Sequence, residues 1–585
     1  MQSSESTLIS NAESQSKYTT LFSKCIKIKN LKLGRALHSR LIKSALIFNT
    51  FLTNRLIQMY SKCNSIDSAQ KVFNELQFKN QHSWNSLISA YSQMARFNDA
   101  RQLFEEMPEP NLVSYNSIIS SLTLRGFYKE AISVFRRMQN LHRYVLWMDE
   151  YTVVGLTNTC ASLAALALLR QVHGVAIAVG LHFNLVVCNA FIDAYGKCGE
   201  PERSYLVFRQ MEEKDIVSWT SVVVAYVFRS RLEDACRIFS QMPAKNVVSW
   251  TALIAGFTQN GEGERALSLF VEMQNEGVLP NDITYVGVLS ACADLALTEK
   301  GKQIHCHVLK YGSSHDFGNV FVINALIDMY CKCGDMTSAM RLFEIFHKKD
   351  IVTWNSIITG FAQNGDGEAS LSIFVKMIQA NLRPNDVTFL GVLSACSHSG
   401  LESEGLQILG IMEKDFGLIP RPEHYAIFID LLGRKNRLKE AVEVIEKAPN
   451  GSDHIGMWGA VLGTCRVHGN LELARRTAEA LFALEPENTA RYVMLSNIYA
   501  TAGMWDDAHQ VRRLVNDRDL KKEAGSSWIE VMNARHKFIA EDVFHPEIEE
   551  IHELLHNLVN QMKDAEYMPH IKTPFFTEYG SPLSV

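Results

Sequence analysis

A unit of 35 residues recurs through this chain and constrains its fold more than any other feature. The clearest copy, from Val247 to Asn281, reads VVSWTALIAGFTQNGEGERALSLFVEMQNEGVLPN. Apolar residues at helical spacing over 250–258 and 264–273 flank a break at Gly261–Gly263, which predicts a helical hairpin. One such hairpin cannot bury its apolar face alone, so it must stack on similar neighbours. The repeat therefore predicts an all-α solenoid of helix-turn-helix repeats.

Residues 15–453 divide into thirteen such units, in which lengths near 31 and 35–38 residues alternate. The units span 15–49, 50–80, 81–111, 112–149, 150–184, 185–215, 216–246, 247–281, 282–319, 320–350, 351–385, 386–421 and 422–453. Two of them carry about three extra residues each, near His142–Trp147 and Ser313–Asn319, which we interpret as loop insertions. Residues 1–14 form a short leader that we expect to be disordered.

Several positions, numbered from the first residue of each unit, hold one kind of side chain. Position 24 is Phe in the eight units that open at 50, 81, 112, 185, 216, 247, 320 and 351. Position 15 is a turn residue in six of these units, namely Asn64, Gly126, Gly199, Gly261, Gly334 and Gly365. Aromatic residues at position 4 could stack on bases, but they share a helical face with Leu and Ile. This placement favours core packing.

Cysteine and histidine residues also recur at fixed positions, which favours structural roles. The twelve Cys fall on helix packing positions, so we predict reduced core thiols and neither disulfides nor a metal site. Cys331 and Cys333 resemble half of a metal site, but no second pair with ligand spacing follows. His38, His173 and His305 share one position, and we predict that they are interhelical side chains rather than ligands.

Charge is distributed unevenly along the chain. Residues 454–585 hold 13 Lys/Arg and 19 Asp/Glu, which leaves 45 Lys/Arg and 44 Asp/Glu for residues 1–453. A nearly neutral repeat array cannot rely mainly on attraction to phosphates, so a nucleic-acid binder of this kind must read bases. No apolar run approaches the length of a membrane span, so we predict no membrane association.

Two positions of each unit are restricted to small polar side chains. Position 5 carries an amide or a hydroxyl in the eight Phe-containing units: Asn54, Asn85, Asn116, Asn189, Thr220, Thr251, Asn324 and Asn355. The last position carries an amide or a carboxylate: Asn80, Asn111, Asp149, Asp215, Asn246, Asn281, Asp350 and Asn385. Helix capping explains the last position but not an Asn inside a helix. We expect the two sets to line one groove, where they could read base edges.

Position 2 carries apolar side chains close to these polar pairs. They are Val113, Val186, Val217, Val248, Ile283, Phe321, Val352 and Val387, with Phe51, His82 and Tyr151 in other units. They could hold unstacked bases, and a buried structural role is an equally good interpretation.

The unit openings VVSWTALI, VTWNSIITGF and NALIDMYCKCG resemble those of the plant organellar pentatricopeptide repeat family, in its class of mixed long, short and standard repeats. The resemblance covers residues 15–565. It implies a right-handed superhelical solenoid in which position 5 and the last position of a unit together read one base of single-stranded RNA, parallel to the protein. In that code Asn with Asp favours U, Asn with Asn a pyrimidine (Y), and Thr with Asn an A.

Applied pair by pair, this code gives the tract Y-Y-U-n-U-A-A-n-U-Y. The bases marked n, and the base after the tract, fall on long units with Val154, Val286 and Leu390 at position 5, so they stay unassigned. The unit that opens at residue 15 is also unassigned, because long units follow the code poorly.

The chain changes character after residue 453. Residues 454–487 and 488–521 resemble two tetratricopeptide-like units of the family's E region, and residues 522–585 resemble its extended E+ segment. This acidic part suits a protein partner. His545-Pro546-Glu547 matches half of the zinc deaminase signature, but no P-C-x-x-C follows, because the last Cys is Cys465. We therefore predict no enzyme activity, no metal, no cofactor and no small-molecule substrate, and a deaminase supplied in trans through residues 454–585.

Three functions follow from these features. The first is site recognition for organellar C-to-U RNA editing. The second is organellar RNA stability, splicing or end processing without a deaminase, and the third is a protein-binding helical scaffold. We expect a mitochondrial location, with the chloroplast as the alternative.

Overall fold

The computed structural model describes residues 16–44, 46–94, 96–141, 148–311, 319–447, 455–517, 526–531, 534–539 and 547–564. The predicted leader, most of both loop insertions and His545-Pro546 lie outside these ranges. The chain divides into two compact units, Met1–Gly256 and Phe257–Val585, each of which is described by itself.

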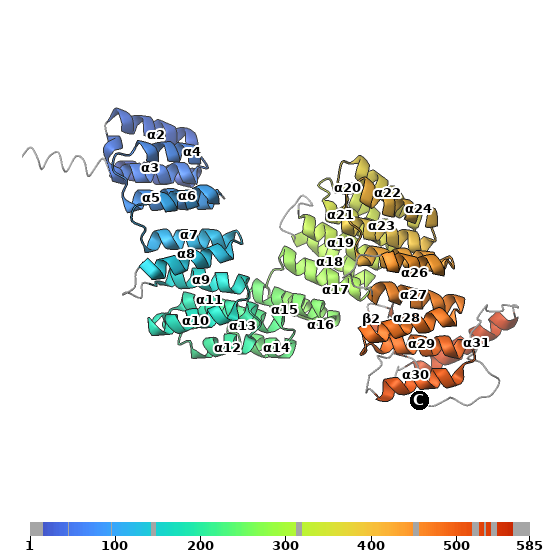
Figure 1. The fold of residues 1–585 in the computed structure, drawn as a ribbon. Helices are drawn as coiled ribbons and strands as arrows, with labels where there is room; N and C mark the ends of the chain where they lie inside the picture. Colours follow the sequence, from blue (N-terminus) through green and yellow to red (C-terminus); the bar gives the residue numbers. More distant parts are fainter. Residues whose placement is uncertain are drawn as a thin grey trace, which may run out of the picture. The chain divides into compact units, whose positions relative to one another are not determined.

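The first compact unit is a stack of helical hairpins, preceded by a helix over residues 16–28 (Figure 1). Its helices are α2 (Leu31–Lys43), α3 (Thr50–Lys62), α4 (Ile66–Glu75), α5 (Gln81–Gln93), α6 (Phe97–Glu106), α7 (Leu112–Leu124), α8 (Tyr128–Leu141), α9 (Glu150–Ser162), α10 (Leu166–Ala178), α11 (Leu185–Lys197), α12 (Pro201–Gln210), α13 (Ile216–Phe228) and α14 (Leu232–Ser240). Short 3-10 turns, η1 (Leu46–Phe48) and η2 (Leu181–Phe183), precede α3 and α11. The helix α15 (Val247–Gln259) contains the boundary between the two compact units.

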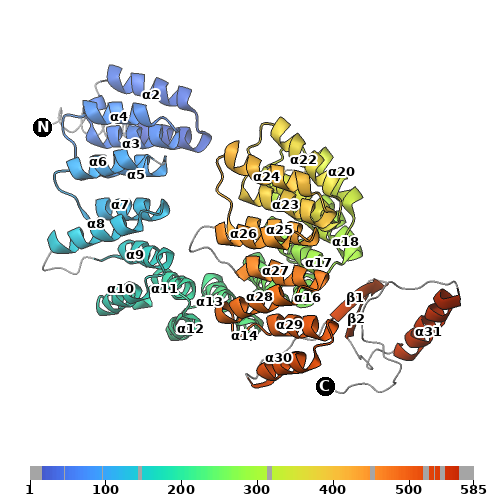
Figure 2. The same ribbon diagram turned by 45° about the vertical axis from the view of Figure 1, so that its right-hand side comes forward.

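The second compact unit continues the same pattern (Figure 2). Its helices are α16 (Gly263–Asn275), α17 (Asp282–Asp294), α18 (Thr298–Tyr311), α19 (Val320–Lys332), α20 (Met336–Ile345), α21 (Ile351–Gln363), α22 (Gly367–Gln379), α23 (Asp386–Ser399), α24 (Glu402–Lys414), α25 (Pro422–Arg434), α26 (Leu438–Lys447), α27 (Ile455–His468), α28 (Leu471–Leu484), α29 (Thr489–Thr501), α30 (Trp505–Asp517) and α31 (Ile548–Asp564). The helices confirm the solenoid of helix-turn-helix repeats.

The first helices of successive repeats pack directly on each other, as α3 on α5, α5 on α7 and α19 on α21. The predicted turns between the two helices of a hairpin have left-handed backbone, with φ of 80° at Gly199, 82° at Gly334 and 58° at Asn64. Gly is favoured there because a side chain strains this conformation, and Asn tolerates it better than most residues.

Aromatic pairs fill the space between hairpins. The position-24 Phe of one repeat meets the position-4 ring of the next edge-to-face, as Phe73 meets Trp84 at 4.9 Å and Phe343 meets Trp354 at 4.8 Å between ring centroids. Such geometry adds to the burial of the rings. The core interpretation of the position-4 aromatics is therefore confirmed.

The recurrent His and Cys side chains are structural. The Nδ1 atoms of His38, His173 and His305 lie 2.9 Å from the hydroxyls of Tyr60, Tyr195 and Tyr330, one in each repeat pair. All twelve cysteines are free. Among the thiols of the described residues, burial raises the pKa of Cys160 and of Cys331 to about 12, as expected for inert core thiols.

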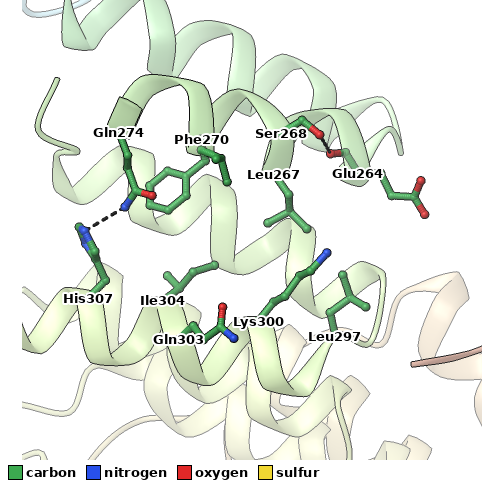
Figure 3. Close-up of a pocket in the computed structure, with 11 residues that line it drawn as sticks. Glu264, Leu267, Ser268, Phe270, Gln274, Leu297, Lys300, Gln303, Ile304 and His307 are labelled. Carbon is green, nitrogen blue, oxygen red and sulfur yellow. Dashed lines mark hydrogen bonds between the residues drawn. The ribbon is translucent and has the colours of Figure 1, made fainter. Parts of the chain in front are cut away.

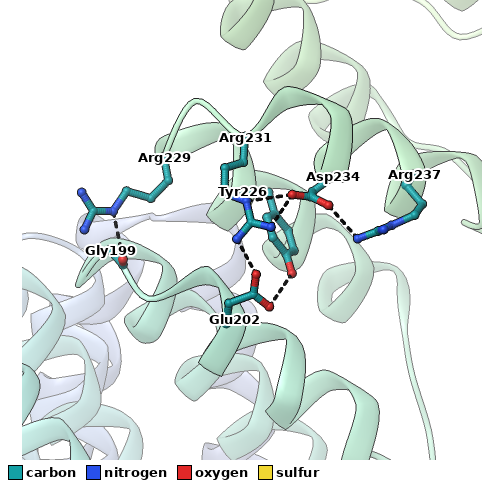
Figure 4. A network of polar contacts seen from close by, with 7 residues as sticks. All are labelled: Gly199, Glu202, Tyr226, Arg229, Arg231, Asp234 and Arg237. Carbon is teal, nitrogen blue, oxygen red and sulfur yellow. Dashed lines mark hydrogen bonds and ion pairs between the residues drawn. The ribbon is translucent and has the colours of Figure 1, made fainter.

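Arginine residues at the start of some second helices tie neighbouring hairpins together. Arg231 forms ion pairs with Glu202 of the preceding repeat and with Asp234 of its own helix, and the guanidinium lies 5.0 Å from the centre of the Tyr226 ring (Figure 4). Arg96 bridges Asp67 and Asp99 in the same way, at 3.0 and 2.7 Å. These contacts link one hairpin to the next.

The C-terminal region contains a β-hairpin that the all-α prediction omitted. Strands β1 (Ser526–Val531) and β2 (Ala534–Ile539) pair antiparallel (Figure 2). The indole Nε1–H of Trp528 donates a hydrogen bond to the backbone carbonyl of Leu295 at 3.1 Å. This contact joins the hairpin to the turn between α17 and α18.

Candidate nucleic-acid interface

In the eight units with Phe at position 24, the last residue caps the first helix of the next unit. The side chains of Asp149, Asp215 and Asp350 accept the backbone N–H of the residue three positions later, at 2.8, 2.8 and 2.9 Å. The amides of Asn80 and Asn385 do the same. Capping is therefore a real function of this position, because these bonds satisfy N–H groups that the helix leaves unpaired.

The position-5 amide reaches across to that same cap. Asn116 donates to both carboxylate oxygens of Asp149, at 2.9 and 3.2 Å, from one first helix to the start of the next. The same contact joins Asn54 to Asn80 (3.3 Å), Asn85 to Asn111 (3.1 Å), Asn189 to Asp215 (3.1 Å), Asn324 to Asp350 (3.1 Å) and Asn355 to Asn385 (3.2 Å). The structure thus brings six of the eight sequence-predicted pairs into contact.

The two pairs that contain Thr differ. The hydroxyls of Thr220 and Thr251 donate to the backbone carbonyls of Ile216 and Val247, at 2.7 and 2.6 Å, within their own helices. Their caps, Asn246 and Asn281, accept the backbone N–H of Ser249 and Thr284, both at 2.8 Å. Thr220 therefore gives Asn246, the cap of the next repeat, one fewer amide donor than an Asn would. Thr251 belongs to the first compact unit and Asn281 to the second.

A hydroxyl at position 3 of the next repeat completes most Asn pairs. Thr152, Ser218, Thr353 and Thr388 donate to the side-chain carbonyl of the position-5 Asn at 2.6–2.7 Å. Among the described residues, the carbonyl oxygens of Asn54 and Asn85 are buried and accept no hydrogen bond. The first two pairs are therefore held by fewer bonds than the later ones.

In six of the eight pairs the two members differ in exposure. Asn54 is 4% exposed, and Asn85, Thr220, Thr251, Asn324 and Asn355 are likewise buried, whereas Asn116, Asn189 and nearly all of the caps are half-exposed. In those six repeats a ligand would meet the cap first. The position-5 side chain would act mainly by orienting the cap and by setting which of its atoms are available.

Two of the caps are carboxylates with perturbed ionisation. Burial raises the pKa of Asp215, but hydrogen bonds from the backbone and hydroxyl of Ser218 and from Asn189 outweigh this effect and hold the pKa below its usual value. Asp350 is shifted in the same direction for the same reasons, with Thr353 and Asn324 as donors. Both caps are ionised hydrogen-bond acceptors at neutral pH.

The apolar side chains at position 2 lie on the surface. Val113, Val186, Val217, Ile283, Phe321 and Val352 are 56%, 60%, 51%, 66%, 71% and 50% exposed. A buried structural role, the alternative interpretation, is therefore excluded for these residues. Each lies on the first turn of a first helix, close to the cap, where an unstacked base could rest on it.

The long repeats carry a different polar contact, which the sequence did not reveal. Asn184 donates to the carboxylate of Glu150 at 3.1 Å, and Asn319 donates to Asp282. In both cases the last residue of a long repeat contacts the first residue of the same repeat, not position 5. The only signal in the sequence was the acidic residue at position 1.

Other surfaces of the described residues show no competing centre. They contain no group of three or more His, Cys, Asp or Glu side chains that could hold a metal ion. A cavity of about 630 Å³ lies between α16 and α18, lined by Leu267, Phe270, Ile304 and His307 (Figure 3). It is formed by second helices, whereas the polar pairs belong to first helices. The helices described here include none that is both long and apolar enough to span a bilayer.

Comparison with known families follows the same repeats. The PPR repeat matches residues 52–80, 82–112, 113–142, 186–216, 217–247 and 321–351. The PPR repeat family matches residues 245–294 and 349–398, and the E motif matches residues 468–530. The repeat matches point to a non-enzymatic helical-repeat protein.

Three Arabidopsis thaliana proteins are similar over nearly the whole chain. Pentatricopeptide repeat-containing protein At2g13600 is 36% identical over 94% of this chain and 74% of its own length. The protein CRR2, chloroplastic, is 33% identical over 96% and 76%. The protein At3g02330, mitochondrial, is 30% identical over 93% of this chain, which spans only 55% of that longer relative.

Among solved structures, maize PPR10 aligns with 86% of this chain and 89% of its own, at 16% identity and a TM-score of 0.42. The two Arabidopsis relatives that this chain covers over about three quarters of their length are each more than 30% identical to it. The chain therefore belongs to the pentatricopeptide repeat family.

Proposed function

We propose that this protein binds single-stranded RNA in a sequence-specific manner, with one base for each polar pair. The observation that carries the proposal is the contact between a position-5 amide and the next helix cap, repeated beside an exposed aliphatic side chain. A side chain that only capped a helix would not need a second amide to orient it. An exposed aliphatic row in the same repeats supplies the surface on which bases rest.

The chemistry of the caps supports the expected base preferences. Uracil has an N3–H donor, which an ionised Asp can accept, whereas the N3 of cytosine is itself an acceptor. Asp149, Asp215 and Asp350 therefore favour U. The amide of Asn80, Asn111 or Asn385 can either donate or accept, so either pyrimidine fits.

The Thr pairs support a different preference. Thr220 and Thr251 direct their hydroxyls to their own helices. Asn246 then keeps an amide group for the base, and Thr251 with Asn281 repeats the same residue types. We assign A to these two positions, which gives the tract Y-Y-U-n-U-A-A-n-U-Y.

We further propose that the protein is a site-recognition factor for organellar C-to-U editing, with the deaminase supplied in trans. The match to the E motif over residues 468–530 supports this role, as does the acidic character of residues 454–585. The names of the relatives include both mitochondrial and chloroplastic proteins. We propose an organellar location, with the mitochondrion first.

Binding selection from a randomised RNA pool tests the first step. The enriched sequences should contain the tract above, and enrichment of no common sequence would contradict RNA reading. Loss of the protein should leave one or a few cytidines downstream of the tract unedited. Altered transcript ends with normal editing would favour a role in stability or processing, and a protein that binds no RNA would favour the scaffold.

A further inference from the structure

The long repeat at 386–421 departs from the other long repeats at its last residue. The last residues of the two repeats described above are Asn184 and Asn319, each of which contacts the acid at position 1 of its own repeat. Here the last residue is Arg421, whose guanidinium Nη1 lies 2.9 Å from a carboxylate oxygen of Asp386 at position 1. The contact joins the same two positions of the repeat, but a cation with five N–H donors takes the place of the neutral amide.

A cavity of about 880 Å³ lies beside this ion pair. Its walls include Arg383 in the loop before α23, Ile419 and Arg421 in the loop before α25, and Tyr425 in the first turn of α25. A volume of this order is typical of sites for small ligands. Asn385, the cap of the last reading pair, also lines the cavity, so the cavity adjoins the proposed reading surface.

The two arginines are held at the cavity by different parts of the chain. Arg383 donates through Nη2 to the backbone carbonyl of Phe416 at 2.7 Å, which ties the two loops together. The side chain of Arg421 is 67% exposed, so the single carboxylate of Asp386 does not enclose it. Two cations against one carboxylate give the cavity a net positive charge.

The backbone beneath the ion pair is fixed by a buried histidine. The backbone N–H of Arg421 donates to Nδ1 of His424 at 3.1 Å, and Nε2 of His424 lies 2.9 Å from the backbone carbonyl of Asp386. With Nδ1 as the acceptor, Nε2 must carry the proton and donate. His424 is 2% exposed, so this link holds Arg421 and Asp386 together without using either side chain.

We propose that this cavity binds the nucleotide that follows the last base of the tract, with its phosphate on Arg383 and Arg421. Guanidinium groups suit phosphate oxygens in charge and geometry. Ile419 is 81% exposed and offers an apolar surface for the base. The inference rests on the proposed function and deepens it, because Leu390 at position 5 leaves this repeat without a reading pair and makes the contact independent of sequence.

The test compares the RNA CCUAUAAAUC with a 3′-hydroxyl and with a 3′-phosphate. For the full-length protein the phosphate should tighten binding about three- to tenfold, as exposed ion pairs with two arginines do. The slope of log K against log salt should steepen by about 0.7. Binding of both RNAs without any gain would overturn this inference alone, whereas failure to bind either would overturn the proposed function with it.

Two substitutions with opposite expected effects separate phosphate binding from a structural ion pair. Arg421→Gln should remove most of the gain from the phosphate, and Asp386→Asn should enlarge it, because the competing carboxylate is lost. Both substitutions break the same ion pair, so equal losses in the two variants would contradict the proposal. Neither touches the backbone link through His424.

A matched control lies at the C-terminal end of α25, the helix that Arg421 precedes. Arg434 forms a 2.8 Å ion pair with Asp430 and is 49% exposed, but it does not line the cavity. Arg434→Gln should retain the full gain from the phosphate, and a loss equal to that of Arg421→Gln would overturn the proposal. Inorganic phosphate, added with the 3′-hydroxyl RNA, should not reproduce the gain. If it did, the cavity would be a site for free anions and not for the strand.

Discussion

Asn116 and Asp149, 33 residues apart in the chain, share two hydrogen bonds of 2.9 and 3.2 Å between neighbouring first helices. The carboxylate of Asp149 also caps its own helix through the backbone N–H of Thr152. One side chain thus serves the fold and the candidate reading site at once. A substitution that removes the cap would confuse the two roles, so substitutions that preserve it are more informative.

Exchange of amide and carboxylate at the cap should change base preference without loss of stability. Asp149→Asn should relax the third base of the tract from U to either pyrimidine, because the amide can donate as well as accept. The converse change, Asn111→Asp, should restrict the second base to U. Asn and Asp cap helices about equally well. Binding to RNAs that vary at one base, together with urea unfolding, measures both effects. Unchanged preference in both variants would contradict the assignment.

Replacement of a Thr by Asn at position 5 should switch the base read by that repeat. Thr251→Asn creates an Asn/Asn pair with Asn281, so the seventh base should change from A to a pyrimidine. The difference should be about tenfold, the cost of one unsatisfied polar contact. Thr220→Asn is the matched control, since it should switch the sixth base and leave the seventh alone. Selection from RNA randomised at the sixth and seventh bases measures both preferences. A change at both bases in one variant, or at neither base, would contradict the assignment.

Removal of an exposed aliphatic residue at position 2 should weaken binding to every sequence. Val352 on α21 and Val375 on α22 are both 50% exposed and belong to one hairpin. Val352→Ser should reduce affinity about tenfold if a base rests on it. Val375→Ser should leave affinity unchanged, and neither change should alter stability by more than about 0.5 kcal/mol. Equal affinities of the two variants would argue against a base-holding surface.

The lowered pKa values of Asp215 and Asp350 predict a stability loss in acid. A carboxyl group with a depressed folded-state pKa stabilises the fold above its unfolded-state pKa of about 3.9. That contribution is lost as the pH falls through the folded-state value. The double variant Asp215→Asn/Asp350→Asn should therefore lose less stability than the wild type between about pH 5 and pH 2. Thermal unfolding of both proteins across this range measures the difference. The same dependence of stability on pH in both proteins would refute the role of these two carboxylates.

The solenoid and the polar pairs were predictable because the same sequence pattern recurs in each repeat. Phe73 and Trp84 belong to positions that recur along the chain, so a single unclear repeat is corrected by the others. The pairing of Asn54 with Asn80 follows from two restricted positions that lie close to the same helix start. The direct hydrogen bond and the burial of Asn54 did not follow, because they depend on the angle between stacked hairpins.

Features that occur once were missed. The strands at 526–531 and 534–539 follow a run of helices, and only the Trp-Ile-Glu-Val sequence suggested extended structure. The contact of Trp528 with Leu295 joins residues 233 apart, and no local pattern encodes it. The Arg421–Asp386 pair was likewise hidden, since position 1 had no assigned role.

The aliphatic Val154 and Val286 have a consequence for the evolution of the target. Under the proposed code, a change at the fourth or eighth base of the tract meets no hydrogen-bonding side chain at position 5, so it should not weaken binding. Two transcripts that differ only at those bases should then bind this protein equally well. One protein could then bind paralogous transcripts that differ at the fourth and eighth bases.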